Sequence, residues 1–168
     1  MAEQPTQPAS PQWIEEGDAA PDFALAADDG REVRLSALRG KPVVLYFYPK
    51  DDTPGCTKEA CSFRDASADL GARGAVVLGV SPDDVASHGR FRDKFHLNFP
   101  LLADAGHRVA SRYGAWREKT LYGKKSMGIQ RSTFLIDREG RVRKVWKKVA
   151  VDGHDQDVLA ALDRLTRP

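Results

Sequence analysis

Two short apolar runs on either side of a helix-length segment restrict the fold more than any other feature of this sequence. Residues 43–48 (VVLYFY) and 75–80 (AVVLGV) each have the length and apolar character of a strand buried on both faces. Between them, the turn residues PKDDTPG lead into a predicted helix from about residue 53 to the region of Gly71 and Gly74. A strand, a helix and a second strand in this order predict a right-handed crossover between parallel strands.

The other elements predicted by the same signals complete an α/β pattern. They are, in chain order, a hairpin within residues 22–38 that turns at ADDG (27–30), a helix capped by Ser81 or Asp83 that runs to about residue 95, a short helix over 107–113, an antiparallel hairpin of residues 132–136 and 141–149, and a last helix over 152–165. Helices interleaved with strands in this way are typical of a sheet covered on both faces. We therefore predict a three-layer α/β fold.

Length and charge favour one ordinary globular domain. The 168 residues are 41% hydrophobic and 30% charged, which suits a single hydrophobic core. Residues 1–12 contain three prolines among Gln, Ser and Ala, and we predict that they form a disordered tail before a single domain over residues 13–168. A net charge of +2 does not indicate a nucleic-acid or membrane partner.

The N-terminal residues also bear on the compartment. They lack the basic region and apolar core of a signal peptide, and no run approaches the roughly 18 apolar residues that a membrane span needs. We therefore expect a cytoplasmic protein. In a reducing compartment a lone cysteine pair is more often catalytic or regulatory than a structural disulfide, which is the alternative.

The only two cysteines, Cys56 and Cys61, indicate a redox site. Cys56 falls in the first turn of the predicted helix, where unpaired backbone N–H groups and the positive end of the helix dipole favour the thiolate. Residues five apart on an ideal helix have Cα atoms about 8.7 Å apart and point about 140° away from each other. A disulfide needs less than about 7 Å. We hypothesise that Cys56 is oxidised first, that the start of the helix unwinds, and that Cys61 then resolves the product as an intramolecular disulfide.

Other cysteine chemistries are not favoured by the sequence. A zinc site needs grouped Cys and His ligands, and no histidine stands at a metal-finger spacing from the cysteines. We therefore expect the four histidines to be surface residues: His88, His96, His107 and His154. A thioredoxin-type cysteine pair with two intervening residues is absent, and nothing signals the histidine base of a cysteine hydrolase.

Two motifs resemble one known family. Pro49-x-x-x-Thr53-x-x-Cys56, followed by TKEAC and FRD, is similar to the motif of the peroxiredoxins, and most of all to their bacterioferritin comigratory protein, or Q-type, branch. The later segments YGAW (113–116), YGKK (122–125) and MGIQRSTFLID (127–137) resemble the same branch. The resemblance covers about residue 17 to the C-terminus and implies a thioredoxin-like three-layer α/β/α sandwich with a central mixed β-sheet.

The resemblance also implies a function. It implies a thiol peroxidase that acts on hydrogen peroxide and organic hydroperoxides, is recycled by thioredoxin, and uses no metal, haem or flavin. Because Cys61 is the only other cysteine, resolution within one chain is expected, and so is a monomer. The alternative function is a non-enzymatic redox sensor or holdase that uses the same cysteines.

Carried over to this sequence, the resemblance implies a set of site residues. Cys56 matches the peroxidatic cysteine, and Thr53, Pro49 and Arg131 match its companions. Arg131 is a permanent cation that can favour the thiolate and hold the peroxide, Thr53 can donate and accept through one hydroxyl, and Pro49 shields the thiolate without offering an N–H. Glu59, one helical turn after Cys56, is expected to orient Arg131.

Each of these roles has a structural alternative. Thr53 can act only as the helix cap, because threonine does this well. Glu59 can be an exposed helix acid, and Cys61 can be a small core residue, as free cysteines often are. Without the resemblance, Arg131 is an ordinary surface arginine at the start of a strand.

Overall fold

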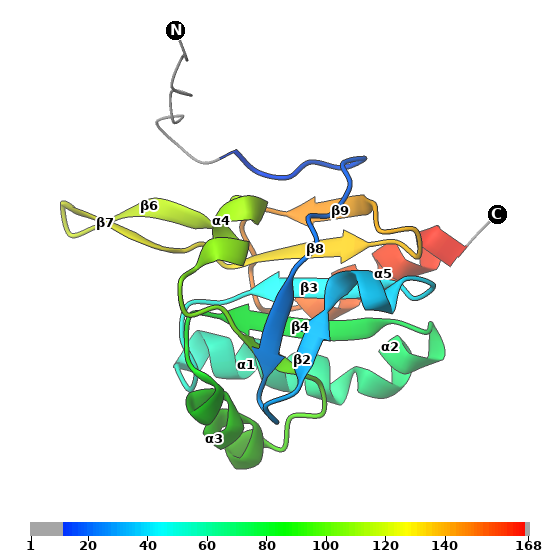
Figure 1. The fold of residues 1–168 in the computed structure, drawn as a ribbon, viewed down its shortest axis with the longest axis horizontal. Helices are drawn as coiled ribbons and strands as arrows, with labels where there is room; N and C mark the ends of the chain where they lie inside the picture. The colour runs from blue at the N-terminus through cyan, green and yellow to red at the C-terminus, as the bar shows by residue number, and fades with distance from the viewer. Residues whose placement is uncertain (1–11, 167–168) are drawn as a thin grey trace, which may run out of the picture.

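A computed structural model describes residues 12–166 of the chain. Residues 1–11 of the predicted tail and residues 167–168 of the predicted domain lie outside the described residues, so the boundary at residue 12 stays a prediction. The main sheet has seven strands in the order β2-β1-β5-β4-β3-β8-β9 (Figure 1). Their bounds are β1 Ala24–Ala27, β2 Glu32–Arg34, β3 Val43–Phe47, β4 Val76–Ser81, β5 Leu101–Ala103, β8 Ser132–Ile136 and β9 Val142–Trp146.

The sheet is mixed, as predicted. Strand β3 pairs in parallel with β4, and β4 in parallel with β5, whereas β3 pairs antiparallel with β8 and β8 with β9. The predicted crossover between parallel strands and both predicted hairpins are therefore present, since β1 and β2 are also antiparallel. Strand β5, of three residues, was not predicted because it is too short to show a periodicity.

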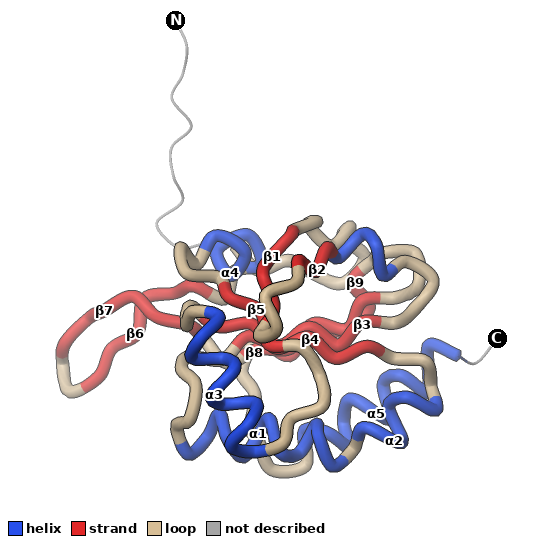
Figure 2. The backbone as a smooth tube through the Cα atoms, turned by 60° about the horizontal axis from the view of Figure 1, so that its bottom comes forward, coloured by secondary structure: helices blue, strands red, loops and turns tan. Residues whose placement is uncertain are grey.

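Alternate side chains of β3 enter two separate cores, which explains its uninterrupted apolar sequence. Val44 and Tyr46 face one core, and Val43, Leu45 and Phe47 face the other. Helices α1 (Pro54–Asp65), α2 (Ser67–Ala72), α3 (Val85–Phe95) and α5 (His154–Thr166) contribute to the first core. The 3₁₀ helix η1 (Leu35–Leu38) and α4 (Arg108–Tyr113) contribute to the second, on the opposite face (Figure 2). The three-layer prediction is confirmed.

The predicted helix after β3 is in fact two helices. Ala66, with φ −86° and ψ 4°, separates α1 from α2. Phe63 before the break and Leu70 after it are both buried in the same core cluster. The cap of α3 also differs from the prediction: Asp84, not Ser81 or Asp83, accepts a hydrogen bond from the backbone N–H of Ser87.

Two histidines predicted at the surface are buried. His88 is fully buried, and His154 is 3% exposed with its Nε2 2.8 Å from the hydroxyl of Thr133. Burial lowers the pKa of His154, although Asp157 and Asp155 oppose the shift. His96 is exposed, and His107 is half-buried in a stack on Trp116 with 3.7 Å between ring centroids.

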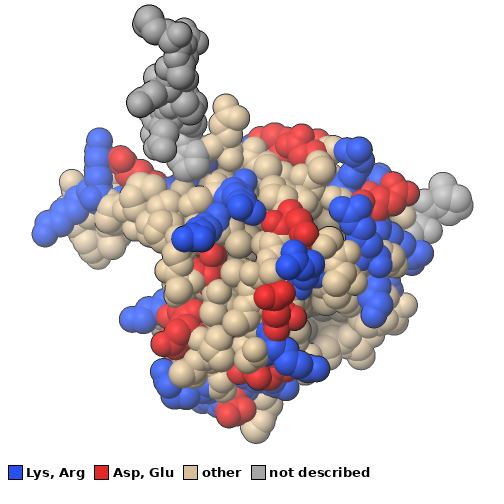
Figure 3. All heavy atoms as spheres, in the orientation of Figure 1, with Lys and Arg blue, Asp and Glu red and all other residues tan. Residues whose placement is uncertain are grey.

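A hairpin arm of strands β6 (Trp116–Leu121) and β7 (Lys124–Ile129) forms a separate two-stranded sheet that projects from the body (Figure 1). Its tip, Tyr122-Gly123, has positive φ at both residues, as a tight two-residue hairpin turn requires. Leu121 and Tyr122 are 66% and 96% exposed. In the view of Figure 3, Lys and Arg side chains extend from the same arm. The arm was not predicted, because strands with little buried surface carry no apolar alternation.

No described helix is long and apolar enough to span a bilayer. The predicted cytoplasmic location remains an expectation.

Candidate active site

Cys56 lies in the first turn of α1, beyond the loop that follows β3. Thr53 occupies the N-cap position, and Pro54, which has no N–H to leave unpaired, is the first helical residue. The first main-chain bond of the helix runs from the N–H of Thr57 to the carbonyl of Thr53. The N–H groups before it have no partner within the helix, so the Cys56 thiol, 2% exposed, lies at a positive helix end.

Arg131 connects the thiol to a buried carboxylate. It stands in the short link between β7 and β8, and its Nη2 donates to Cys56 Sγ at 3.1 Å while its Nη1 donates to Glu59 Oε1 at 2.7 Å. A Cβ at Gly55 would lie 3.1 Å from Arg131 Nη2, so a glycine there leaves room for the guanidinium. The fork of one arginine thus bridges two groups on adjacent turns of α1.

Glu59 is fully buried, so the alternative of an exposed helix acid is wrong. Burial raises its pKa to about 7, although Arg131 opposes this by charge and by hydrogen bonding. The pKa of Arg131 is itself raised: burial lowers it, but Glu59 and Cys56 together outweigh that effect. The guanidinium therefore keeps its charge next to the sulfur.

Thr53 and Pro49 both lie in the loop between β3 and α1. The hydroxyl of Thr53 donates to the carbonyl of Lys50 at 2.9 Å and makes no cap hydrogen bond to the helix. Its lone pairs are the part of the hydroxyl that can accept from a substrate. Pro49 is half-buried, two residues after the end of β3.

Cys61 is on the same helix as Cys56, is half-buried, and like Cys56 carries a free thiol. Standard helix geometry separates their Cα atoms by about 8.7 Å and points the side chains in different directions. The two sulfurs cannot bond while α1 is intact.

Two further groups near the site have no signal in the sequence. Burial lowers the pKa of Lys119 on β6, Arg131 lowers it further, and Cys56 opposes, so this ammonium lies in the field of the site. Tyr46 is fully buried, with a hydroxyl that has no hydrogen-bond partner among residues 12–166. Burial raises its pKa well above the ordinary value, and Glu59 and Cys56 add to the rise.

One group of potential metal ligands lies beside the site loop. An oxygen or nitrogen ligand atom from each of Asp51, Asp83 and His88 lies within 4.8 Å of the others. These atoms already hydrogen-bond to one another and to neighbouring groups. Neither cysteine belongs to this group.

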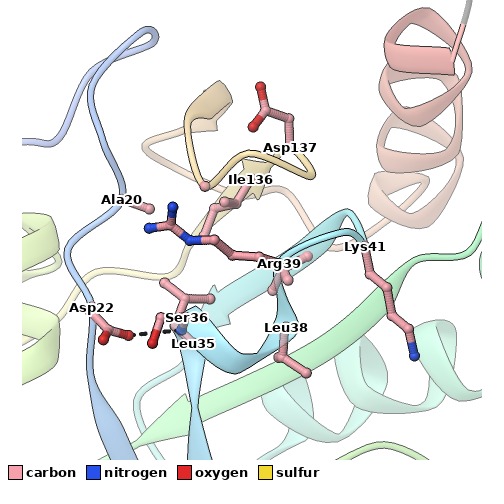
Figure 4. A pocket seen from close by; sticks show the side chains of 11 residues that line it. Ala20, Asp22, Leu35, Ser36, Leu38, Arg39, Lys41, Ile136 and Asp137 are labelled. Carbon is pink, nitrogen blue, oxygen red and sulfur yellow. Dashed lines mark hydrogen bonds between the residues drawn. The ribbon is translucent and has the colours of Figure 1, made fainter.

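The pocket of Figure 4 is far from Cys56 in the fold. Leu35 and Arg39 line it together with Val43, which begins β3, and Ile136, which ends β8, whereas Cys56 follows the opposite end of β3. Its volume of about 10 Å³ is that of a single water site. We therefore do not connect it with the chemistry of the thiol.

The comparisons with known proteins agree with one another. A model of the AhpC/TSA family matches residues 16–145. The chain is 52% identical over 149 residues to a putative peroxiredoxin bcp of Coxiella burnetii (89% of this chain, 99% of that protein). It is 51% identical over 149 residues to peroxiredoxin Bcp of Bacillus subtilis (89% and 95%). The solved structure of the Xanthomonas campestris bacterioferritin comigratory protein, which addresses that protein's alkyl peroxide reduction activity, matches with a TM-score of 0.81 and 42% identity over 84% of this chain and 90% of that one.

Proposed function

The chain belongs to the AhpC/TSA family, as a peroxiredoxin of the Bcp or Q-type branch, and from this membership we propose that it reduces hydrogen peroxide and organic hydroperoxides at Cys56. Peroxiredoxins are thiol peroxidases, so a hydroperoxide and a thiol reductant are its substrates. The observation that best supports the choice of residues is the contact of one arginine, Arg131, with both Cys56 and Glu59.

In the first step the Cys56 thiolate attacks one peroxide oxygen. An S–O bond forms while the O–O bond breaks, and the leaving alkoxide or hydroxide takes up a proton and departs as alcohol or water. Arg131 stabilises the thiolate and the negative charge that develops on the oxygens, and Glu59 holds the guanidinium in place. Thr53 orients the peroxide, and Pro49 excludes water from the thiolate. Cys56 is left as a sulfenic acid.

In the second step Cys61 resolves the sulfenic acid. Its thiolate attacks the sulfur of Cys56, an S–S bond forms, and the hydroxide that leaves is protonated to water. Because both cysteines are on α1, the first turns of this helix must unwind before the sulfurs can meet. A dithiol protein such as thioredoxin then reduces the disulfide and is itself oxidised. Since both cysteines come from one chain, a monomer is sufficient for the cycle.

The decisive experiment mixes reduced protein with one equivalent of hydrogen peroxide and follows the intact mass from milliseconds to seconds. We expect rapid conversion to a monomeric species lighter by two hydrogen atoms, with Cys56 and Cys61 linked in its peptide map. Oxidation no faster than that of an ordinary exposed thiol would reject the peroxidase and favour a redox sensor. An oxidised crystal form with α1 intact from Cys56 to Cys61 would reject the resolving step.

A further inference from the structure

A buried polar cluster lies behind the loop that carries Thr53, and the proposed chemistry does not use it. Its centre is Asp51, 8% exposed, whose carboxyl group has three hydrogen-bond partners, one from the same loop and two from α3. Tyr48 Oη donates to Oδ1 at 2.6 Å, Ser87 Oγ donates to Oδ2 at 2.8 Å, and His88 Nδ1 lies 2.7 Å from Oδ2. Three partners on one carboxyl group hold it in a fixed orientation.

His88 on α3 connects Asp51 to strand β5. Its Nδ1 lies 2.7 Å from Asp51 Oδ2, and its Nε2 lies 2.9 Å from the carbonyl oxygen of Leu102, which can only accept. Both ring nitrogens are therefore hydrogen-bonded, which fixes the orientation of the ring. His88 is fully buried, so this pair lies inside the protein.

Two hydrogen bonds from backbone N–H groups hold the loop that carries the cluster. Tyr48 donates its N–H to the carbonyl of Val80 at 3.0 Å, and the N–H of Asp51 donates to Asp83 Oδ2 at 2.8 Å. Between these two anchors lies Lys50, whose carbonyl receives the hydroxyl of Thr53. The direction of the Thr53 lone pairs is thus set by a carbonyl next to Asp51.

We propose that Asp51, paired with His88, is a positioning residue for peroxide reduction, which holds the loop of residues 49–53 so that the Thr53 hydroxyl faces the peroxide beside Cys56. The inference rests on the proposed function. It assigns no contact between Asp51 and substrate. The cluster acts by fixing Lys50, and a displacement of about 1 Å in a group that orients a reacting molecule can cost about 100-fold in rate.

The test compares two reactions of Cys56 in wild type and Asp51→Asn, each followed by quench and mass spectrometry. One is oxidation by hydrogen peroxide, which needs the positioned Thr53, and the other is alkylation by iodoacetamide, which needs only a reachable thiolate. We expect the peroxide rate to fall at least tenfold and the alkylation rate to change less than threefold. Asp29→Asn is the matched control: it removes the same charge from an exposed aspartate outside this loop, one paired with Arg31, and both rates should stay as in wild type.

The outcomes separate this inference from the proposed function. If wild type itself reacts slowly with peroxide, the proposed function fails. If wild type reacts rapidly and Asp51→Asn leaves the ratio of the two rates unchanged, the positioning role is overturned, because a merely structural aspartate would alter stability or both rates together.

A second variant avoids dependence on Asp51→Asn alone. Ser87→Ala removes a single hydrogen bond from Asp51 and should lower the peroxide rate in the same direction by a smaller factor, again with alkylation preserved. A peroxide rate in Ser87→Ala equal to that of wild type would count against the positioning role.

Discussion

Arg131 is the residue on which the site depends most, because one planar cation meets a sulfur and a carboxylate at once. Lysine has a single ammonium and cannot make the same two fixed contacts. The importance of the residue was predictable only from its motif: an arginine that begins a strand is ordinarily exposed, and its two partners lie 75 and 72 positions away in the sequence.

Arg131→Ala should slow the oxidation of Cys56 by about 100- to 1,000-fold, the effect of removing a donor from a developing anion. The oxidation rate of Arg131→Lys should lie between those of Arg131→Ala and wild type, since lysine restores the positive charge but not the two fixed hydrogen bonds of the guanidinium. The rate is measured with reduced protein and excess hydrogen peroxide in a rapid-quench instrument. Arg138→Ala, at an exposed turn, is the control. Equal rates for all three variants would contradict the role of Arg131.

Glu59 should make stability depend on pH. Its pKa rises from 4.5 to about 7 on folding, because burial opposes the carboxylate more than Arg131 favours it. Between these two pH values the folded state binds more protons than the unfolded state. The contribution of Glu59 to the free energy of unfolding is therefore fully present below pH 4.5 and is lost as pH rises to about 7. A pKa shift of this size changes the free energy of unfolding by up to about 3 kcal/mol.

Urea unfolding of wild type and Glu59→Gln from pH 4.5 to 8 measures this contribution. The advantage of wild type over the variant should shrink as pH rises, while the exposed Glu118→Gln shows no such trend. A constant difference between wild type and Glu59→Gln across the range would show that Glu59 keeps an ordinary pKa.

At the level of elements, α1 has to do two opposite things in the proposed cycle. Intact, it holds Cys56 and Glu59 against Arg131, and unwound, it brings Cys56 to Cys61. Outside the site, Lys58 near the start of α1 forms an ion pair with Asp152 in the loop before α5. In the last turn of α1, Arg64 donates a hydrogen bond to the carbonyl of Phe95. We expect unwinding of the first turns to break the Lys58 ion pair and to leave the Arg64 hydrogen bond in place.

Cys61→Ser separates the two tasks. We expect Cys56 to be oxidised by hydrogen peroxide at the wild-type rate, because the guanidinium of Arg131 donates to Cys56 and Glu59, which the change leaves in place, and we expect a sulfenic acid instead of a disulfide. Turnover with thioredoxin as sole reductant should stop. Mass spectrometry and a coupled thioredoxin assay report the two effects, and unchanged turnover in the assay would show that another group resolves the intermediate.

The elements that the sequence revealed are those with buried faces. The apolar runs of β3 and β4 predicted the parallel pair at the centre of the sheet, but the arm of β6 and β7 has too little buried surface to leave a pattern. The burial of His88 was not predictable, since its partners Asp51 and Leu102 come from two distant segments. The motif indicated Cys56, Thr53 and Arg131, but it gave no sign of the buried cluster around Asp51.

In the whole molecule, residues 13 and 14, near the start of the described chain, pack against the base of the arm. Ile14 donates its N–H to the carbonyl of Tyr113, and Trp13 packs on Phe134 beneath the guanidinium of Arg117. Gly114 makes this approach possible: its φ is +90°, and a Cβ there would lie 2.6 Å from the Cα of Trp13.

Gly114→Ala should therefore displace the segment around Trp13 and destabilise the protein by at least about 2 kcal/mol, through backbone strain and lost aromatic packing. Thermal unfolding followed by circular dichroism measures the loss. Gly71→Ala is the matched control, because it lies in α2 with open space around it, and it should be neutral or slightly stabilising. Equal melting temperatures for the two variants would refute the close packing at Gly114.

The break at Ala66 bears on how much of the molecule must open in each turn of the proposed cycle. A continuous helix from Pro54 to Ala72 would melt as one cooperative unit, and release of Cys56 would then also draw on the hydrogen bonds of its far end. Because the helix is divided at Ala66, we expect α1 to open as a separate unit while Leu70 of α2 stays in the core. Amide hydrogens of α1 should accordingly exchange with solvent through a local opening of lower free energy than those around Leu70. In the proposed cycle, this local opening of the reduced protein is the same motion that the resolving step requires.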